Sequence, residues 1–214
     1  MEKQASKSMK IYLAVLVILG WFALILQFYI NITSKAAAIP EIIVRYFSYF
    51  TLTTNLIVAT CCTTLLFKPN SRWGNFFSQQ KTLTAITVYI IIVGIIYNII
   101  LRFIWSPKGL QMIIDELLHS VIPVLFLVYW LIFVLKNQLK WQDVLPWLIY
   151  PLVYTIFILL RGAVSGFYPY PFINISELGL KNALINAIGI AIVFLIVSLL
   201  FVAIGKFVNK KHLE

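Results

Sequence analysis

The chain of 214 residues is 62% hydrophobic and 11% charged, with a mean hydropathy of +0.96. This composition excludes a soluble domain of this size and predicts an integral membrane protein. The formal net charge of +10 does not indicate nucleic-acid binding, because the Lys and Arg residues lie between hydrophobic runs and form no single basic face. We therefore expect the bilayer, and no nucleic acid, as a partner.

Six hydrophobic runs follow one another, each about 20 residues long, which as a helix crosses a hydrocarbon core of about 30 Å. They are continuous rather than alternating, which favours helices over a β-barrel. The sequence predicts an all-α, polytopic integral membrane protein in which residues 1–214 form a single six-helix transmembrane domain. The predicted spans are 11–30, 46–67, 83–104, 113–135, 144–162 and 183–205.

The cationic residues are unevenly divided between the two sides of such a bundle. Six spans return both termini to one side, and that side holds eleven of the 17 Lys and Arg residues, against six on the other. The positive-inside rule then predicts a multi-pass protein of the cell membrane with both termini in the cytoplasm. The eleven are Lys3, Lys7, Lys10, Lys68, Arg72, Lys81, Lys136, Lys140, Lys206, Lys210 and Lys211.

Several familiar kinds of site are excluded by the sequence. Cys61 and Cys62 are neighbours in one run, and side chains at adjacent helical positions point about 100° apart, so they predict neither a disulfide nor a metal site. Phosphate-binding loops and nucleotide fingerprints are lacking, and GAVSG at 162–166 puts Ser165 at the wrong offset for a nucleophile elbow. We expect buried thiols, no metal and no cofactor.

Ionisable residues gather where the fourth run begins. Asp115, Glu116 and His119 stand there, and His119 is the one histidine of the hydrophobic body, because His212 lies in the tail. A central Asp in a spanning helix costs roughly 2.5 to 3.5 kcal/mol, so such residues usually face protein, water or a ligand. Either carboxylate, one helical turn before His119, is positioned to fix its tautomer and raise its basicity.

A second polar cluster lies in the second run, where Thr51, Thr54 and Asn55 share one helical face at i, i+3 and i+4. Thr51 is about five residues into its span and His119 about six, so both are expected about 8 to 9 Å below the outer boundary. Because their depths match, the two clusters could line one cavity, in which a hydroxyl nucleophile and a histidine base would meet. The alternative stays open that each Thr bonds back to its own helix and that His119 only packs.

The connection at 163–182, AVSGFYPYPFINISELGLKN, is rich in aromatic residues. Pro169 and Pro171 predict a non-helical segment here. Two interpretations remain open: an interfacial aromatic belt, or a lid or re-entrant cap over a cavity.

Three stretches carry a resemblance to a known family. They are RYFSYFTLTTNLIVA at 45–59, LLHSVIPVLFLVYW at 117–130 and LPWLIYPLVYTIFILLRGAVSGFYPYPFINISELG at 145–179. The chain resembles the androgen-induced membrane proteins and the androgen-dependent TFPI-regulating protein, and most of all their prokaryotic six-helix relatives. The animal members are threonine hydrolases that cleave fatty acid esters of hydroxy fatty acids. The resemblance implies that the catalytic histidine is His119, in HSVIP, and that the nucleophile is Thr51, in YFTLTTN, with Thr54 as its rival.

The leading hypothesis is therefore a hydrolase of lipid esters whose substrate enters from the outer leaflet. His119 would take the proton of Thr51, and Asp115 or Glu116 would orient the imidazole. Asn55 and Asn98 are the candidate oxyanion donors. Arg102 and Arg161 are expected to bind a carboxylate or else to snorkel to the interface. Tyr168 and Glu177, in the connection 163–182, are expected to be supporting residues.

Two other function classes stay open. One is a non-enzymatic lipid-binding or transport protein with a polar pocket in the outer half of the bilayer, for which intramembrane Arg, Asp, Glu and His are equally expected. The other is a pseudoenzyme or assembly partner, which binds a lipid without turnover.

Overall fold

The computed structural model of the protein describes residues 6–210, and every regular element in this range is a helix. The prediction of an all-α fold is therefore confirmed, and six segments are long and apolar enough to cross a membrane, as expected of a multi-pass membrane protein. Lys3, Lys211 and His212 lie outside the described residues. The six segments are Lys7–Thr33, Phe50–Phe67, Gln80–Phe103, Leu110–Phe133, Trp141–Ser165 and Ile175–Val208.

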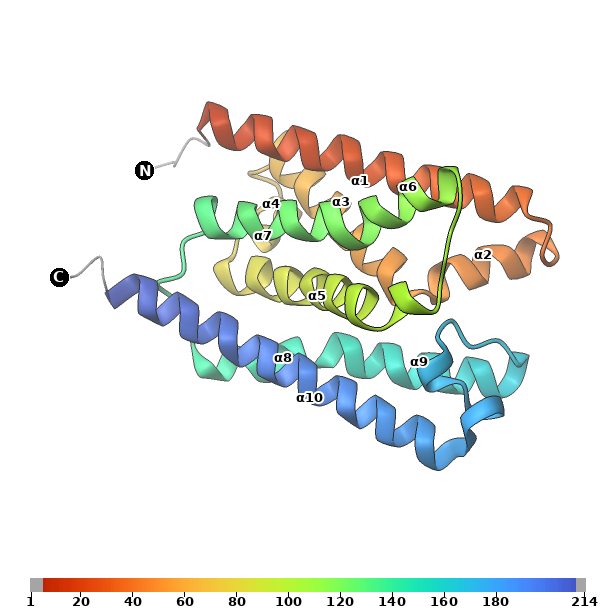
Figure 1. Ribbon diagram of the computed structural model, residues 1–214. Coiled ribbons are helices and arrows are strands. Elements are labelled where there is room, and N and C mark those ends of the chain that lie inside the picture. Colours follow the sequence, from red (N-terminus) through yellow and green to blue (C-terminus); the bar gives the residue numbers. More distant parts are fainter. Residues whose placement is uncertain (1–5, 211–214) are drawn as a thin grey trace.

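The helices form two groups on either side of α5 (Gln80–Ile99). On one side, α1 (Lys7–Thr33) packs against α3 (Phe50–Phe67) and α7 (Ile122–Phe133), and both α3 and α7 also pack against α5. On the other side lie α9 (Ile149–Ser165) and α10 (Ile175–Lys210), and α10 packs against both α5 and α9. The start of α1 and the end of α10 are at the same end of the molecule (Figure 1).

Shorter elements complete the chain between these helices. The helix α2 leads into α3, α4 joins α3 to α5, and α6 and the π-helical turn η2 lead into α7. Their bounds are α2 Ile39–Ser48, α4 Arg72–Phe77, η1 Leu101–Phe103, α6 Leu110–Glu116, η2 Leu117–Val121, η3 Trp141–Asp143, α8 Val144–Trp147 and η4 Pro171–Ile173.

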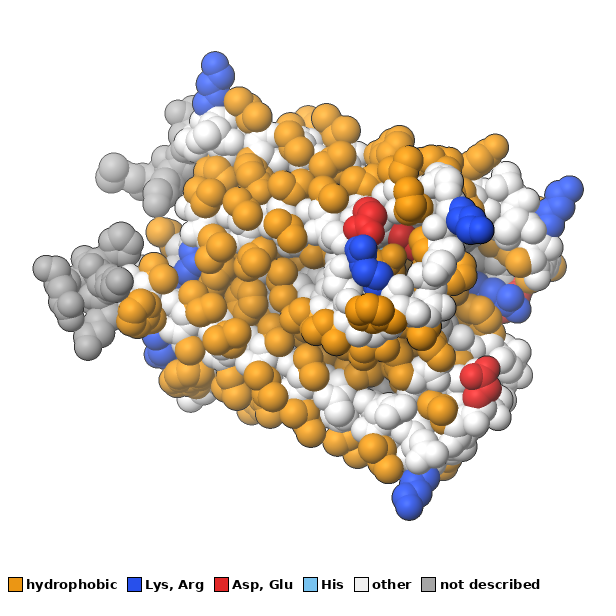
Figure 2. All heavy atoms as spheres, viewed as in Figure 1, with side chains coloured by type: hydrophobic (Ala, Val, Ile, Leu, Met, Phe, Trp, Pro, Cys, Tyr) orange, Lys and Arg blue, Asp and Glu red, His pale blue; other side chains and the backbone are white. Residues whose placement is uncertain are grey.

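The distribution of apolar side chains is that of a protein surrounded by lipid. Large aliphatic residues such as Ile18, Leu160 and Ile188 are exposed, and hydrophobic side chains cover the middle of the face shown in Figure 2, with Lys and Arg mostly toward its two ends. The core between the helices is also apolar. Cys61 and Cys62 are free and fully buried in it, as the sequence predicted.

The second predicted span, 46–67, is broken at Tyr49. This residue is extended (φ −85°, ψ 123°), so α2 ends at Ser48 and α3 begins at Phe50. The break is stable because the N–H of Phe50, which a continuous helix would bond internally, donates instead to the hydroxyl of Tyr154 at 3.1 Å. Thr51 is therefore the second residue of α3, and the expectation that it lies about five residues inside a span is wrong.

The segment predicted to be non-helical, 163–182, is shorter than expected. The helix α9 continues to Ser165 and ends at Gly166, which has φ 71°, and α10 already begins at Ile175, ahead of the predicted start at 183. A kink at Gly179 (φ 73°, ψ 157°) separates the first turn of α10 from the rest of the helix. The irregular segment is thus 166–174, which we call the aromatic loop.

Candidate active site

Thr51 lies in the first turn of α3, where two tyrosines take the place of a helix cap. The N–H of Thr51 donates to the hydroxyl of Tyr170 at 3.3 Å, and the Thr51 Oγ1 lies 3.5 Å from the same oxygen. The hydroxyl of Tyr154 accepts from Phe50 and donates to the carbonyl of Ser48 at 2.7 Å. The free N–H groups that begin any helix are thus satisfied here by side chains of α9 and the aromatic loop.

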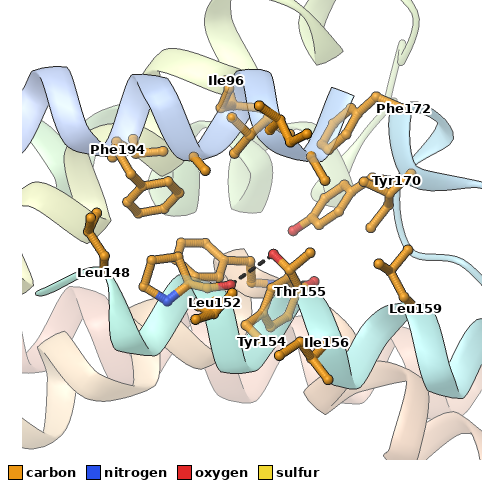
Figure 3. Close-up of a pocket in the computed structure, with 18 of the residues that line it drawn as sticks. Ile96, Leu148, Leu152, Tyr154, Thr155, Ile156, Leu159, Tyr170, Phe172 and Phe194 are labelled. Atoms are coloured by element: carbon orange, nitrogen blue, oxygen red, sulfur yellow. Dashed lines mark hydrogen bonds between the residues drawn. The ribbon is translucent and has the colours of Figure 1, made fainter. Parts of the chain in front are cut away.

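A cavity of about 550 Å³ reaches Thr51. Its wall is almost entirely apolar, with aliphatic and aromatic side chains from α5, α9 and α10 (Figure 3). Four of its residues carry a hydroxyl, namely Thr51, Tyr154, Thr155 and Tyr170. Such a cavity suits a long acyl chain with one polar group near Thr51.

Thr54 is in a different environment from Thr51. It is fully buried, its Oγ1 lies 3.2 Å from the hydroxyl of Tyr150, and it is not among the residues that line the cavity. Although Thr51 and Thr54 are one turn apart, the geometry favours Thr51 as the group that a bound lipid meets.

His119 lies in the π-helical turn η2, and its ring is held from two sides. Its Nδ1 is 2.8 Å from the carbonyl oxygen of Asp115, which can only accept, so Nδ1 carries the proton and Nε2 is left as a proton acceptor. The imidazole stacks on Tyr97 with ring centroids 3.9 Å apart. This tautomer suits a general base. His119 is not among the residues that line the cavity.

The carboxylates do not orient His119 as the sequence predicted. The Asp115 carboxylate accepts from Trp105 Nε1 at 2.6 Å and from Gln111 Nε2 at 2.7 Å, and Glu116 pairs with Arg102 at 2.6 Å. The main chain of Asp115 is what holds the imidazole. Because a helix places the carbonyl four residues back within reach of a side chain, this role does not depend on the carboxylate.

Asn55 and Asn98, expected as oxyanion donors, bind the main chain instead. Pro123 has no N–H, so it cannot donate to the carbonyl of His119, four residues earlier, as in an α-helix. Nor can it donate to the carbonyl of Leu118, five residues earlier, as in a π-helix. These two carbonyls accept from amides of neighbouring helices: Leu118 from Asn55 Nδ2 at 3.2 Å, and His119 from Asn98 Nδ2 at 3.4 Å.

Each of these amides also uses its second N–H. Asn55 donates to the carbonyl of Thr51 at 2.8 Å and Asn98 to that of Gly94 at 2.9 Å. Neither side chain therefore keeps a donor for a substrate. The amide of Asn55 nevertheless has a positional effect, because it bridges the main chain of Thr51 to that of Leu118, which precedes His119.

The arginines expected to bind a substrate carboxylate are already paired with acids. Arg102 pairs with Glu116, and Arg161, which is only 8% exposed, donates to Glu41 Oε1 at 2.8 Å. Arg45 donates to the same oxygen at 2.8 Å. Glu41 lies outside the membrane-crossing helices, and its hydrogen bonds to Arg45 and Arg161 hold the pKa of its carboxyl below the usual value.

Tyr168 and Glu177, the two candidates from the connection 163–182, lie away from the cavity wall. Glu177 is exposed in the first turn of α10, and Tyr168 packs its ring against Gly162 of α9. Arg45 and Arg161 place their guanidinium groups 4.5 and 4.8 Å from the ring centroid of Phe167. The loop is thus held to α2 and α9, which leaves Tyr170 as its tyrosine in the cavity.

Comparisons with models of protein families, with curated proteins and with solved structures gave no match to the chain.

Sequence analysis missed three tyrosines that shape the site: Tyr97 beneath His119, and Tyr154 and Tyr170 at the start of α3. One signal in the sequence pointed to Tyr170. Tyr170 stands between Pro169 and Pro171, so it has a restricted backbone within a loop that was already singled out. Tyr97 and Tyr154 carry no such signal, because an aromatic residue in an apolar run is ordinary.

Proposed function

We propose that the protein is a membrane-embedded hydrolase of lipid esters, such as fatty acid esters of hydroxy fatty acids, with Thr51 as nucleophile and His119 as base. The observation that carries the proposal is the bridge made by Asn55, which ties the main chain of Thr51 to that of the residue before His119. The unprotonated Nε2 of His119 and the apolar cavity at Thr51 add a base and a place for an acyl chain.

The reaction has two steps in this proposal. In the first, His119 Nε2 takes the proton of Thr51, whose oxygen attacks the ester carbonyl. The bond to the alcohol oxygen breaks, and the alcohol leaves with the proton from the imidazolium. In the second step, His119 takes a proton from water and the hydroxide attacks the acyl-threonine. The bond between the acyl carbon and Thr51 Oγ1 breaks, the imidazolium returns its proton to Oγ1, and the fatty acid is released.

The orientation in the cell membrane is part of the same proposal. The end of the bundle that holds the start of α1 and the end of α10 carries most of the Lys residues, which the positive-inside rule places in the cytoplasm. Thr51, next to the break at Tyr49, then lies toward the outer leaflet, as does the aromatic loop. Substrate would reach the cavity from that leaflet, past α9 and α10.

The experiment is hydrolysis of a fatty acid ester of a hydroxy fatty acid by purified protein in detergent, together with labelling by a lipophilic fluorophosphonate. Thr51→Ala and His119→Ala should each abolish turnover and label, while Thr51→Ser should retain both. Thr54→Ala, one turn away and outside the cavity, is the matched control and should behave as wild type. Unchanged turnover in Thr51→Ala would contradict the proposal.

A second candidate function is the binding or transport of an amphiphilic lipid without chemistry. One observation favours it: the cavity wall includes Thr51 but not His119. A fatty acid that binds wild type and His119→Ala equally, with no hydrolysis of any ester, would support this alternative over the hydrolase.

A further inference from the structure

Tyr170 stands out among the hydroxyl groups of the cavity because its proton is not committed to the main chain. Tyr154 donates to the carbonyl of Ser48 at 2.7 Å, and Thr155 donates to that of Pro151 at 2.8 Å. The hydroxyl of Tyr170 accepts from the N–H of Thr51, and its other polar neighbours are the Thr51 Oγ1 at 3.5 Å and the hydroxyl of Tyr154. Both of these neighbours are side-chain hydroxyls rather than main-chain carbonyls, so the Tyr170 O–H can turn from them to a substrate.

The position of this phenol is fixed by packing. Tyr170 is only 8% exposed, its ring stacks on Phe172 with centroids 5.1 Å apart, and the ring of Tyr49 meets it edge-on at 5.9 Å. Figure 3 shows its oxygen directed into the space between α9 and α10. A donor that is held before the substrate arrives costs no reorganisation during the reaction.

The start of α3 makes this hydroxyl a better donor. The N–H of Thr51 belongs to the first turn, the positive end of the helix, and it donates to the phenol oxygen. A hydroxyl that accepts a hydrogen bond is polarised and donates its own proton more strongly. Burial raises the pKa of Tyr170 to about 12, so the phenol keeps its proton at neutral pH.

We propose that Tyr170 is a catalytic residue whose hydroxyl donates a hydrogen bond to the carbonyl oxygen of the ester as Thr51 attacks it. This inference rests on the proposed hydrolase function. No proton is transferred: the phenol keeps its hydrogen and stabilises the negative charge that develops on the carbonyl oxygen. The distance between the two side chains suits this role. The Tyr170 hydroxyl oxygen lies 3.5 Å from Thr51 Oγ1, so when Oγ1 attacks the carbonyl carbon of an ester, the carbonyl oxygen comes within hydrogen-bond reach of Tyr170.

The other candidates for this role are occupied. Asn55 and Asn98 use both N–H groups on carbonyl oxygens, and Arg102 and Arg161 are paired with acids. Tyr170 is thus the donor that remains next to Thr51 within the described residues.

The test compares Tyr170→Phe with Tyr168→Phe, a tyrosine of the same loop that lies outside the cavity. Removal of one oxyanion donor typically lowers kcat about 100-fold or more, so Tyr170→Phe should lose about that factor in kcat with KM little changed. Tyr168→Phe should keep wild-type kinetics. Equal kcat in the two variants and wild type overturns the role of Tyr170.

A second measurement separates catalysis from packing. A long-chain trifluoromethyl ketone forms a tetrahedral adduct with an oxyanion, so Tyr170→Phe should weaken its binding by about the factor lost in kcat. The binding of a saturated fatty alcohol, which forms no oxyanion, should not change. Equal losses for both ligands would show a packing role and overturn the inference. Absence of turnover in wild type overturns the proposed hydrolase itself, and this inference with it.

Discussion

The imidazole of His119 lies parallel to the phenol ring of Tyr97, with centroids 3.9 Å apart and 12° between the planes. Tyr97 is buried on α5, and the guanidinium of Arg102 lies 5.3 Å from the centroid of the same ring. With Nδ1 bound to the main chain of Asp115, this stacking leaves the imidazole little freedom to turn. The orientation of the proposed base is thus set by α5 as well as by its own helix.

Replacement of Tyr97 by Leu should therefore lower kcat of ester hydrolysis about tenfold, since aromatic pairs contribute roughly 0.5 to 1.5 kcal/mol beyond their buried area. Tyr97→Phe keeps the stacked ring and should keep most of the activity. Steady-state kinetics of both variants check this. Equal activity in Tyr97→Leu and wild type would show that the stacking does not position the base.

Asn55→Leu should destabilise the fold, because the carbonyl of Leu118 then loses its donor and Pro123 offers no N–H in its place. A buried carbonyl left unpaired costs about 1 to 3 kcal/mol in the free energy of unfolding. Asn98→Leu is the matched control. The hydrogen bond from Asn98 to the carbonyl of His119 is longer, at 3.4 Å, and Asn98 is exposed. The loss in the free energy of unfolding should therefore be smaller for this variant. Unfolding in mixed micelles measures both, and a larger loss for Asn98→Leu would contradict the argument.

Gly162→Ala should disturb the aromatic loop, because the new methyl group would overlap the ring of Tyr168. Overpacking of this kind costs about 1 to 3 kcal/mol. Gly189→Ala on α10 is the control, since its methyl group meets no atom within 4 Å and alanine favours helix. Thermal unfolding should separate the two, with a lower Tm for Gly162→Ala. A Tm unchanged by Gly162→Ala would mean that Tyr168 moves aside without cost.

The contact of Glu41 with Arg45 and Arg161 should make the attachment of the aromatic loop depend on pH. Since the pKa of Glu41 is lowered in the folded protein, the contact stabilises at pH values above the ordinary Glu pKa and its contribution is lost as the pH falls through the lowered value. Limited proteolysis within 166–174 should accelerate at acid pH in wild type. In Glu41→Gln it should be faster already at neutral pH, with little further change. Glu177→Gln, at an exposed position, should follow wild type.

The sequence predicted the parts of this fold that depend on hydrophobic length. All six membrane-crossing helices lie where continuous apolar runs were found, and Cys61 and Cys62 are buried as expected. The break at Tyr49 was missed because it depends on hydroxyl groups supplied by Tyr154 and Tyr170, more than a hundred residues away. A span predicted from hydropathy alone takes no account of hydrogen-bond partners that lie so far away in the sequence.

The site was predicted less completely, for a similar reason. Asn55 and Asn98 were recognised as polar residues in apolar helices, but their role depends on Pro123, whose missing N–H leaves carbonyl oxygens on another helix to be paired. Asp115 was expected to act through its carboxylate and instead acts through its main chain. Residue identity indicated where polar groups gather, whereas hydrogen-bond direction depends on the packing of the helices.

The burial of Cys61 and Cys62 has a practical consequence. Both thiols are fully enclosed between helices, so a water-soluble maleimide should leave the folded wild-type chain unmodified. The natural sequence therefore serves as its own cysteine-less background. A single cysteine at Lys35 or at Lys68, at opposite ends of the bundle, can report from intact cells which end faces the medium.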